Sequence, residues 1–224
     1  MNPETTTRNP AVHAETALAT NKVIRNTYML LSLTLLFSAL MAGVSMVMNW
    51  PHPGMILTLV GYFGLLFLTH KFQNSALGLV FVFALTGFMG VTLGPIISAY
   101  LTMLPNGGQV VMMAMGGTGA IFVGLSLYVL TTRKNFSFMG GFLMVGILVA
   151  FLAGLGAWFF QMPGLSLAVS AMFVLLMSGL ILYQTSELVH GGETNYIVAT
   201  VTLFVSIYNL FLSLLHLLGA FSND

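Results

Sequence analysis

The last apolar stretch of the chain carries polar residues at a regular helical spacing. Between Gly191 and Gly219, steps of four and three residues connect Asn195, Ala199, Thr202, Ser206, Asn209, Ser213 and His216. Residues at this spacing share one face of an α-helix, and we call this set the polar stripe. Because a polar group in hydrocarbon needs a partner or water, the stripe must lie against other helices or line a cavity. It predicts that this helix is the hub of a bundle.

A second group of chemically capable residues lies just before the stripe. Gln184 and Glu187 are three residues apart and share a helix face, and His190 is of the residue type that titrates near neutral pH. Glu187, His190 and Glu193 have two interpretations. They are either a solvated loop at a helix end or a pH- or cation-sensitive mouth that leads to the stripe.

The composition identifies the class of protein. Hydrophobic residues make up 58% of the chain and charged residues 5%, whereas soluble domains carry about a quarter charged residues. The chain is therefore an integral membrane protein that lies in a lipid bilayer. The formal net charge of +1 and the lack of a basic face exclude nucleic-acid binding. The absence of cysteine excludes disulfides, thiolate catalysis and cysteine metal sites.

The apolar runs predict an all-α fold with seven transmembrane helices. Residues 1–25 are polar and predict a flexible cytoplasmic N-terminal tail, and residues 26–224 form one seven-helix domain. The expected spans cover residues 26–50, 55–69, 76–104, 109–132, 136–160, 165–186 and 195–219. The third is long and contains Pro95, so we expect it to be kinked or broken there.

The basic residues predict the orientation of the chain. All six lysines and arginines precede the first span or lie in the loops after the second and fourth spans. By the positive-inside rule this side is cytoplasmic. The N-terminus is then cytoplasmic and the C-terminus periplasmic.

The spans contain small residues suited to packing and no recognisable catalytic group. Glycines are expected to let helices approach closely; they are Gly61, Gly64, Gly87, Gly90, Gly94, Gly116, Gly117, Gly119, Gly154 and Gly156. No span has a charged residue at its centre, which disfavours active transport. We find no metal motif and no nucleophile placed with a base, so we predict a non-enzyme without catalytic residues, metal or cofactor.

Four ordered motifs carry a resemblance to a known family. They occupy residues 86–96 (TGFMGVTLGPI), 116–122 (GGTGAIF), 125–140 (LSLYVLTTRKNFSFMG) and 190–197 (HGGETNYI). With them the chain resembles the Bax inhibitor-1 family of seven-span membrane proteins, in particular its bacterial YccA-like branch. The resemblance implies a bundle whose seventh helix is surrounded by helices one to six.

The resemblance also implies one of two activities. Some members are similar to pH-sensitive calcium leak channels gated by two aspartates, on the sixth and seventh helices. YccA-like members associate with the membrane protease FtsH and restrain its degradation of membrane proteins. At the aspartate positions this chain has Gln184 and Ser206, which cannot form the shared-proton switch of two carboxylates but could hydrogen-bond to each other.

We therefore predict a bacterial inner-membrane regulator that binds FtsH, with its N-terminal tail offered to the protease. The alternative is a leak that passes calcium or protons along the seventh helix.

Overall fold

The described part of the protein is an antiparallel bundle of α-helices. The computed structural model describes residues 10–222, with side chains from residue 18 onward. The elements are α1 (Pro10–Val47), α2 (Met55–Lys71), α3 (Ala76–Met103), α4 (Gly107–Thr132), the 3₁₀ helix η1 (Ser137–Met139), α5 (Gly140–Phe159), α6 (Pro163–His190) and α7 (Tyr196–Phe221). Six are long and apolar enough to cross a membrane, and α2, with 17 residues, is a shorter apolar helix. The prediction of an all-α membrane protein with seven helices is confirmed.

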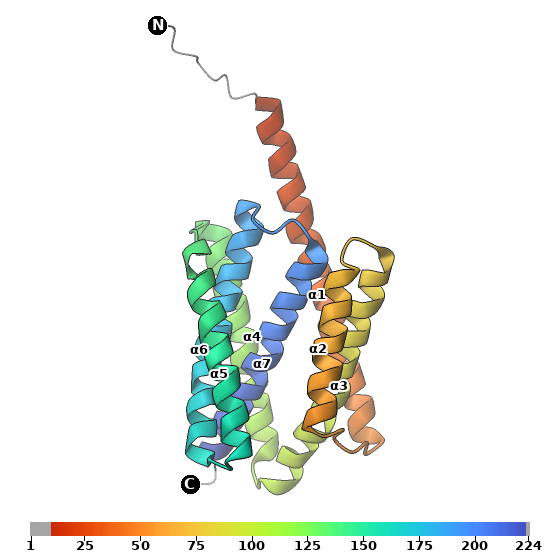
Figure 1. The fold of residues 1–224 in the computed structure, drawn as a ribbon, viewed down its shortest axis with the longest axis vertical. Helices are drawn as coiled ribbons and strands as arrows, with labels where there is room; N and C mark the ends of the chain where they lie inside the picture. The colour runs from red at the N-terminus through yellow and green to blue at the C-terminus, as the bar shows by residue number, and fades with distance from the viewer. Residues whose placement is uncertain (1–9, 223–224) are drawn as a thin grey trace, which may run out of the picture.

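Helix α1 begins well before the first predicted span. It starts at Pro10 and extends beyond the rest of the bundle (Figure 1). Proline is favoured in the first turn of a helix, and alanines and Leu18 in this segment are strong helix formers that extend an existing helix at little cost. The structure thus has residues 10–25 in a helix, while residues 1–9 lie outside the described part. The flexible tail of residues 1–25 stays a prediction.

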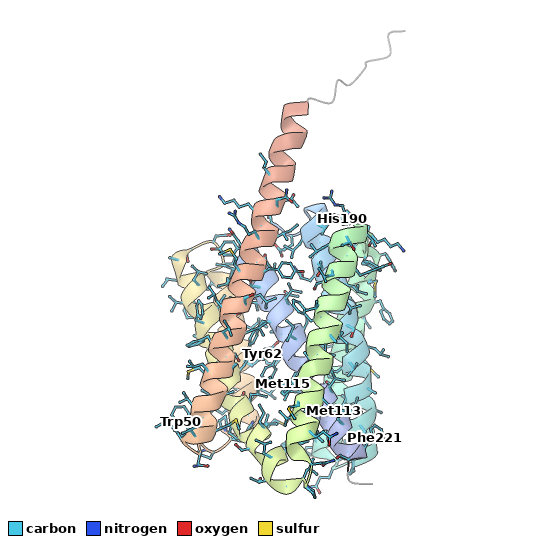
Figure 2. All side chains as sticks on the ribbon, turned by 180° about the vertical axis from the view of Figure 1, so that it is seen from behind. Trp50, Tyr62, Met113, Met115, His190 and Phe221 are labelled. Carbon is cyan, nitrogen blue, oxygen red and sulfur yellow. The ribbon has the colours of Figure 1, made fainter. Side chains whose placement is uncertain are left out.

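The alternating directions of the helices gather the basic residues at one end of the bundle. Lys22 and Arg25 lie on α1 before it enters the bundle, Lys71 ends α2, and Arg133 and Lys134 follow α4. This is the end that carries His190, opposite to Trp50 and Phe221 (Figure 2).

Helices α1 and α3 form the most extensive helix pair, and glycines of α3 make their approach possible. A Cβ atom added to Gly90 would overlap the backbone of Ser38, and one added to Gly87 would lie 2.7 Å from the Phe37 ring. Small residues at such positions let two helix backbones come close in a membrane. Glycine packing is confirmed here. The prediction was wrong for four other glycines, around which a Cβ would meet nothing within 4 Å: Gly64, Gly116, Gly119 and Gly156.

Pro95 lies inside α3 without breaking it. Because proline has no N–H, the carbonyl of Val91 loses the donor that it would have in a regular helix. The hydroxyl of Ser45, on α1, donates to this carbonyl instead, with an Oγ–O distance of 2.9 Å. A neighbouring helix thus supplies the hydrogen bond that the proline removes, as a chain in hydrocarbon requires.

The roles of Ser45 and Pro95 can be tested by a double-mutant cycle. Ser45→Ala leaves the Val91 carbonyl without a donor and should destabilise the protein by about 1–3 kcal/mol. In the Pro95→Ala background the helix supplies its own N–H, so the same serine change should cost clearly less. Unfolding in detergent micelles measures both costs, and equal costs in the two backgrounds would show that Ser45 does not compensate for the proline.

A glycine pair tests the α1–α3 contact. Gly90→Ala should destabilise the bundle by about 1–3 kcal/mol because the added methyl overlaps the backbone of α1. Gly116→Ala is the matched control, since it makes the same change in a helix where the methyl meets open space. The control should be neutral or slightly stabilising. Similar unfolding midpoints for the two variants would contradict a close α1–α3 approach at Gly90.

Helix α7 contributes to every hydrophobic cluster found among the described residues. Phe204 belongs to the first cluster, Leu210 to the second, and Phe211 and Leu215 to the third. Helix α7 packs against α1, α2, α3, α4 and α6. In the described part of the chain, α5 packs on α6 and η1, and no Cα atom of α5 comes within 8 Å of α7. The predicted arrangement, in which helices one to six surround the seventh, is therefore incomplete in the described structure, because α5 does not pack against α7.

Candidate functional site

Asn195, the first residue of the polar stripe, organises the start of α7. Its Oδ1 accepts from the backbone N–H of Ile197 at 2.9 Å, a helix cap of a common kind. Its Nδ2 donates to the Gln73 carbonyl at 3.1 Å and to Asn74 Oδ1 at 2.9 Å. Glu193 Oε1 accepts from the Asn195 N–H at 2.7 Å. These bonds attach the α2–α3 connection to the beginning of α7.

The other stripe residues are paired locally or packed between helices. Ser206 is fully buried and donates to the Thr202 carbonyl at 2.7 Å, and Asn209 Nδ2 donates to the Val205 carbonyl at 2.8 Å. His216 Nδ1 lies 2.8 Å from Ser170 Oγ on α6, and Ser213 is buried. In the described structure no hydrogen bond joins the side chain of one stripe residue to the side chain of another.

Gln184 and Ser206 do not form the hydrogen bond that we considered for them. Gln184 is 5% exposed, and its Nε2 has no hydrogen-bond partner. The hydroxyl of Ser206 donates to its own helix, as short hydroxyl side chains in helices often do. The buried Nε2 donor of Gln184 is therefore unpaired, which lowers the free energy of unfolding by about 1–3 kcal/mol relative to a paired donor.

Glu187, His190 and Glu193 do not converge on one point. Glu187 Oε1 accepts a hydrogen bond from Ser137 Oγ, just before α5. Glu193 Oε1 instead accepts from the backbone N–H of Asn195, at the start of α7. Among the described residues, no three side chains of the kinds that bind metals are grouped to hold an ion. Instead Glu187 and His190 connect the end of α6 to the segment between α4 and α5.

His190 makes the more unusual of these connections. Its Nδ1 lies 2.8 Å from the Ser186 carbonyl oxygen, and its Nε2 lies 3.0 Å from the Arg133 carbonyl oxygen. Arg133 has a left-handed conformation, with φ 51°, where α4 ends. Since a neutral imidazole has one N–H, the ring donates to both carbonyl oxygens only when both nitrogens carry a proton. The Ser186 hydroxyl oxygen also accepts a hydrogen bond from the backbone N–H of Phe136, at 2.9 Å.

Removing the imidazole should loosen the segment between α4 and α5. In His190→Ala, hydrogen exchange of the Phe136 amide should become roughly 2–10-fold faster, because one or two bonds of about 0.5–1.5 kcal/mol are lost nearby. His70→Ala is the control, since that ring contacts a backbone oxygen of its own helix, at Leu66. Unchanged exchange in His190→Ala would show that the connection does not hold the segment.

The structure also contains a groove that the sequence analysis missed. Its volume is about 700 Å³, and it lies between α2 and α3 on one side and α5 and α6 on the other, with α7 as its floor. Thr202 and Asn209 of the polar stripe line it, beside Tyr208. The Tyr208 hydroxyl lies 3.1 Å from Thr92 Oγ1 on α3.

Residues that sequence reasoning did not select make up much of this groove. Tyr62 lines it midway along the bundle (Figure 2), and His52 and His70 line it near the two ends of α2. Tyr62 and Tyr208 lie inside apolar runs and were the sequence signal that could have indicated the groove, because tyrosine combines a large apolar ring with one polar atom. The glutamates and His190 of the predicted mouth do not line the groove.

Comparison with known proteins decides the family. The family model described as "Inhibitor of apoptosis-promoting Bax1" matches residues 20–223, which include most of α1 and all of α2 to α7. The chain belongs to the Bax inhibitor-1 family. The family resemblance inferred from the motifs is thereby confirmed.

Three similar proteins come from bacteria. The chain is 55% identical over 92% of its length to "Modulator of FtsH protease YccA" of Escherichia coli K12, covering 94% of that protein. It has the same identity and coverage to "Inner membrane protein YccA" of another E. coli strain. It is also 57% identical to an uncharacterised protein of Pseudomonas aeruginosa, over 90% of each chain.

Proposed function

We propose that this family member is a non-enzymatic regulator in the bacterial inner membrane that binds the FtsH protease and restrains its proteolysis of membrane proteins. The observation that carries the proposal is the 55% identity, over 92% of the chain, to a protein named as a modulator of FtsH. Because the identity covers nearly the full length of both proteins, the two share the whole bundle rather than one motif. The relative named as an inner membrane protein supports the location.

The proposed orientation has the N-terminus in the cytoplasm and the C-terminus in the periplasm. It is supported by the gathering of the described lysines and arginines at one end of the bundle, because such residues favour the cytoplasmic side. We further propose that α7 is the central helix, supported by its part in all three core clusters. In this orientation the connection between α6 and α7 is cytoplasmic.

The segment of α1 that extends past the bundle is the proposed contact for the protease. It lies at the basic end, where Leu18 is 70% exposed and Lys22 and Arg25 are exposed. Further along, Val23 and Ile24 pack against the first core cluster, which fixes the extension to the bundle. A helical handle held in this way offers a partner an attachment point, while the close α1–α3 packing resists extraction of the chain.

Deletion of residues 2–22, which include the exposed Leu18 and Lys22, tests the proposal. This change removes the outer part of α1 and leaves Val23 and Ile24 in place, so the bundle should keep its thermal stability. Co-purification of FtsH from gently solubilised membranes should fall at least several-fold, and degradation of an FtsH membrane substrate should become faster. Trp50→Ala, at the opposite end of the bundle, is the control and should change neither. Unchanged co-purification and unchanged substrate turnover after the deletion would contradict the proposed contact.

The alternative function, a cation leak along α7, has less support. Its basis is that Thr202 and Asn209 line the groove. However, Ser206 and Asn209 donate to carbonyl oxygens of their own helix. By the family resemblance, Gln184 and Ser206 also replace the carboxylates of the leak-channel members. Equal calcium flux in liposomes with and without the protein, across pH, would remove this alternative.

A further inference from the structure

The groove follows α2 along most of the thickness of a membrane. Its lining includes His52, in the connection before α2, and His70, near the last residue of α2. A helix of 17 residues is about 25 Å long, which approaches the roughly 30 Å of a hydrocarbon core. In the described structure α2 and α5 do not pack along their backbones, and α7 is visible between them (Figure 1). Phe63 on α2 and Leu148 on α5 line the groove and are 47% and 57% exposed, so the groove opens sideways, toward lipid.

The lining of the groove suits an apolar chain. Most of its residues are aliphatic or aromatic, and none of the residues that line it is Asp, Glu, Lys or Arg. Three of the polar side chains that line it, those of Thr92, Tyr208 and Asn209, already have partners. Thr92 Oγ1 donates to the Met89 carbonyl at 2.8 Å and lies next to the Tyr208 hydroxyl, and Asn209 donates to a carbonyl of its own helix. An apolar chain in the groove would therefore leave few polar groups of the protein without a hydrogen-bond partner.

The size of the groove favours a flexible chain over a partner helix. A transmembrane helix of about 20 residues, some 30 Å long and at least 10 Å across, occupies roughly 2,400 Å³. The groove offers about 700 Å³, which lies in the range of small-molecule sites. The rings of Phe63 on α2 and Phe151 on α5 meet edge to face across the groove, with centroids 5.8 Å apart. This pair narrows the opening and can hold a thin chain in place.

The two ends of the groove differ in charge. At the His70 end, Lys71 is the next residue, and its Nζ lies 5.8 Å above the Phe72 ring. The nearest described carboxylate on that side, Glu193, is engaged with the Asn195 N–H. At the other end, His52 Nδ1 accepts from the Gly54 N–H at 3.0 Å, and no lysine or arginine occurs between residues 26 and 70. A negatively charged headgroup is therefore favoured at His70 and Lys71.

From these observations we propose that the groove binds one acyl chain of an anionic phospholipid, with the phosphate at His70 and Lys71. The chain lies along α7, over Thr202, Val205 and Asn209, and enters from the bilayer between α2 and α5. This site is independent of the proposed contact with FtsH, which lies on the extension of α1.

Native mass spectrometry of the full-length protein in detergent tests the proposal. The probes are palmitoyl-oleoyl phosphatidylglycerol and the phosphatidylcholine with the same chains. We expect one phosphatidylglycerol molecule to remain bound at collision energies that remove the phosphatidylcholine, with at least a several-fold difference in occupancy. Equal retention of the two lipids would overturn the assignment of the headgroup. Detergent or a second copy of the chain in place of lipid would overturn the site.

A matched pair of substitutions locates the lipid. Leu148 and Leu152 lie on α5 and are each 57% exposed, but of the two only Leu148 lines the groove. Leu148→Trp should reduce occupancy by phosphatidylglycerol about tenfold, because the larger side chain takes up groove volume, and Leu152→Trp should not. Neither residue is in the core, so both variants should fold. Equal occupancy in the two variants would overturn the location.

A second variant separates the headgroup from the chain. The double substitution His70→Ala and Lys71→Ala should lower retention of phosphatidylglycerol to the level of phosphatidylcholine and leave phosphatidylcholine unchanged. Retained preference for phosphatidylglycerol in this variant would show that the anionic headgroup is held elsewhere.

Discussion

The fold depends on the burial of α7 between the other helices. Each hydrophobic cluster in the described structure contains a residue of this helix, so the clusters cannot form independently of it. In a bilayer no hydrophobic force drives helices together, because lipid tails are as apolar as leucine. Association must come from close packing, and α7 is the element against which α1, α4 and α6 all pack. Ala199, Ser206 and Ser213 of the polar stripe are buried in this arrangement, whereas Thr202 and Asn209 line the groove.

The same environment requires that polar groups be satisfied close to where they occur. Ser206 and Asn209 bond to carbonyls of their own helix, and Ser45 supplies the donor that Pro95 removes from α3. These solutions need no water and no continuous polar path. They fit a bundle that is held closed better than one that conducts. Gln184 is the exception, a buried amide with an unpaired donor.

The basic end of the bundle and its side between α2 and α5 offer different kinds of contact. The basic end presents the extension of α1 and the segment that His190 and Glu187 connect to α6. The side between α2 and α5 presents an apolar groove instead. A regulator of a membrane protease needs both a firm bundle and an accessible cytoplasmic surface. The proposed lipid site adds a contact with the surrounding membrane, and its headgroup position at His70 and Lys71 lies at the same basic end as the extension of α1.

The sequence by itself determined the class, the number of helices and the family. Hydrophobic runs of membrane length are local properties, and the ordered motifs of residues 86–140 are specific enough to identify relatives. The sequence also indicated that α7 has a polar face that must be sheltered, because the period of the stripe is that of a helix. It did not indicate the helix over residues 10–25, since helix propensity next to a packed helix is enough to extend that helix without an apolar pattern.

The tertiary structure alone decided which of these features meet. The spacing of Gly90 and Gly116 in the sequence is equally compatible with packing, but only Gly90 faces another backbone closely. The partner of the Val91 carbonyl is on a different helix, and the groove is lined by residues from five helices. Likewise, Glu187, His190 and Glu193 are close in the chain but have different partners. Glu187 and His190 contact the segment between α4 and α5, and Glu193 contacts the start of α7. A periodic sequence shows which face a side chain lies on, whereas the neighbour opposite that face depends on how the helices are arranged.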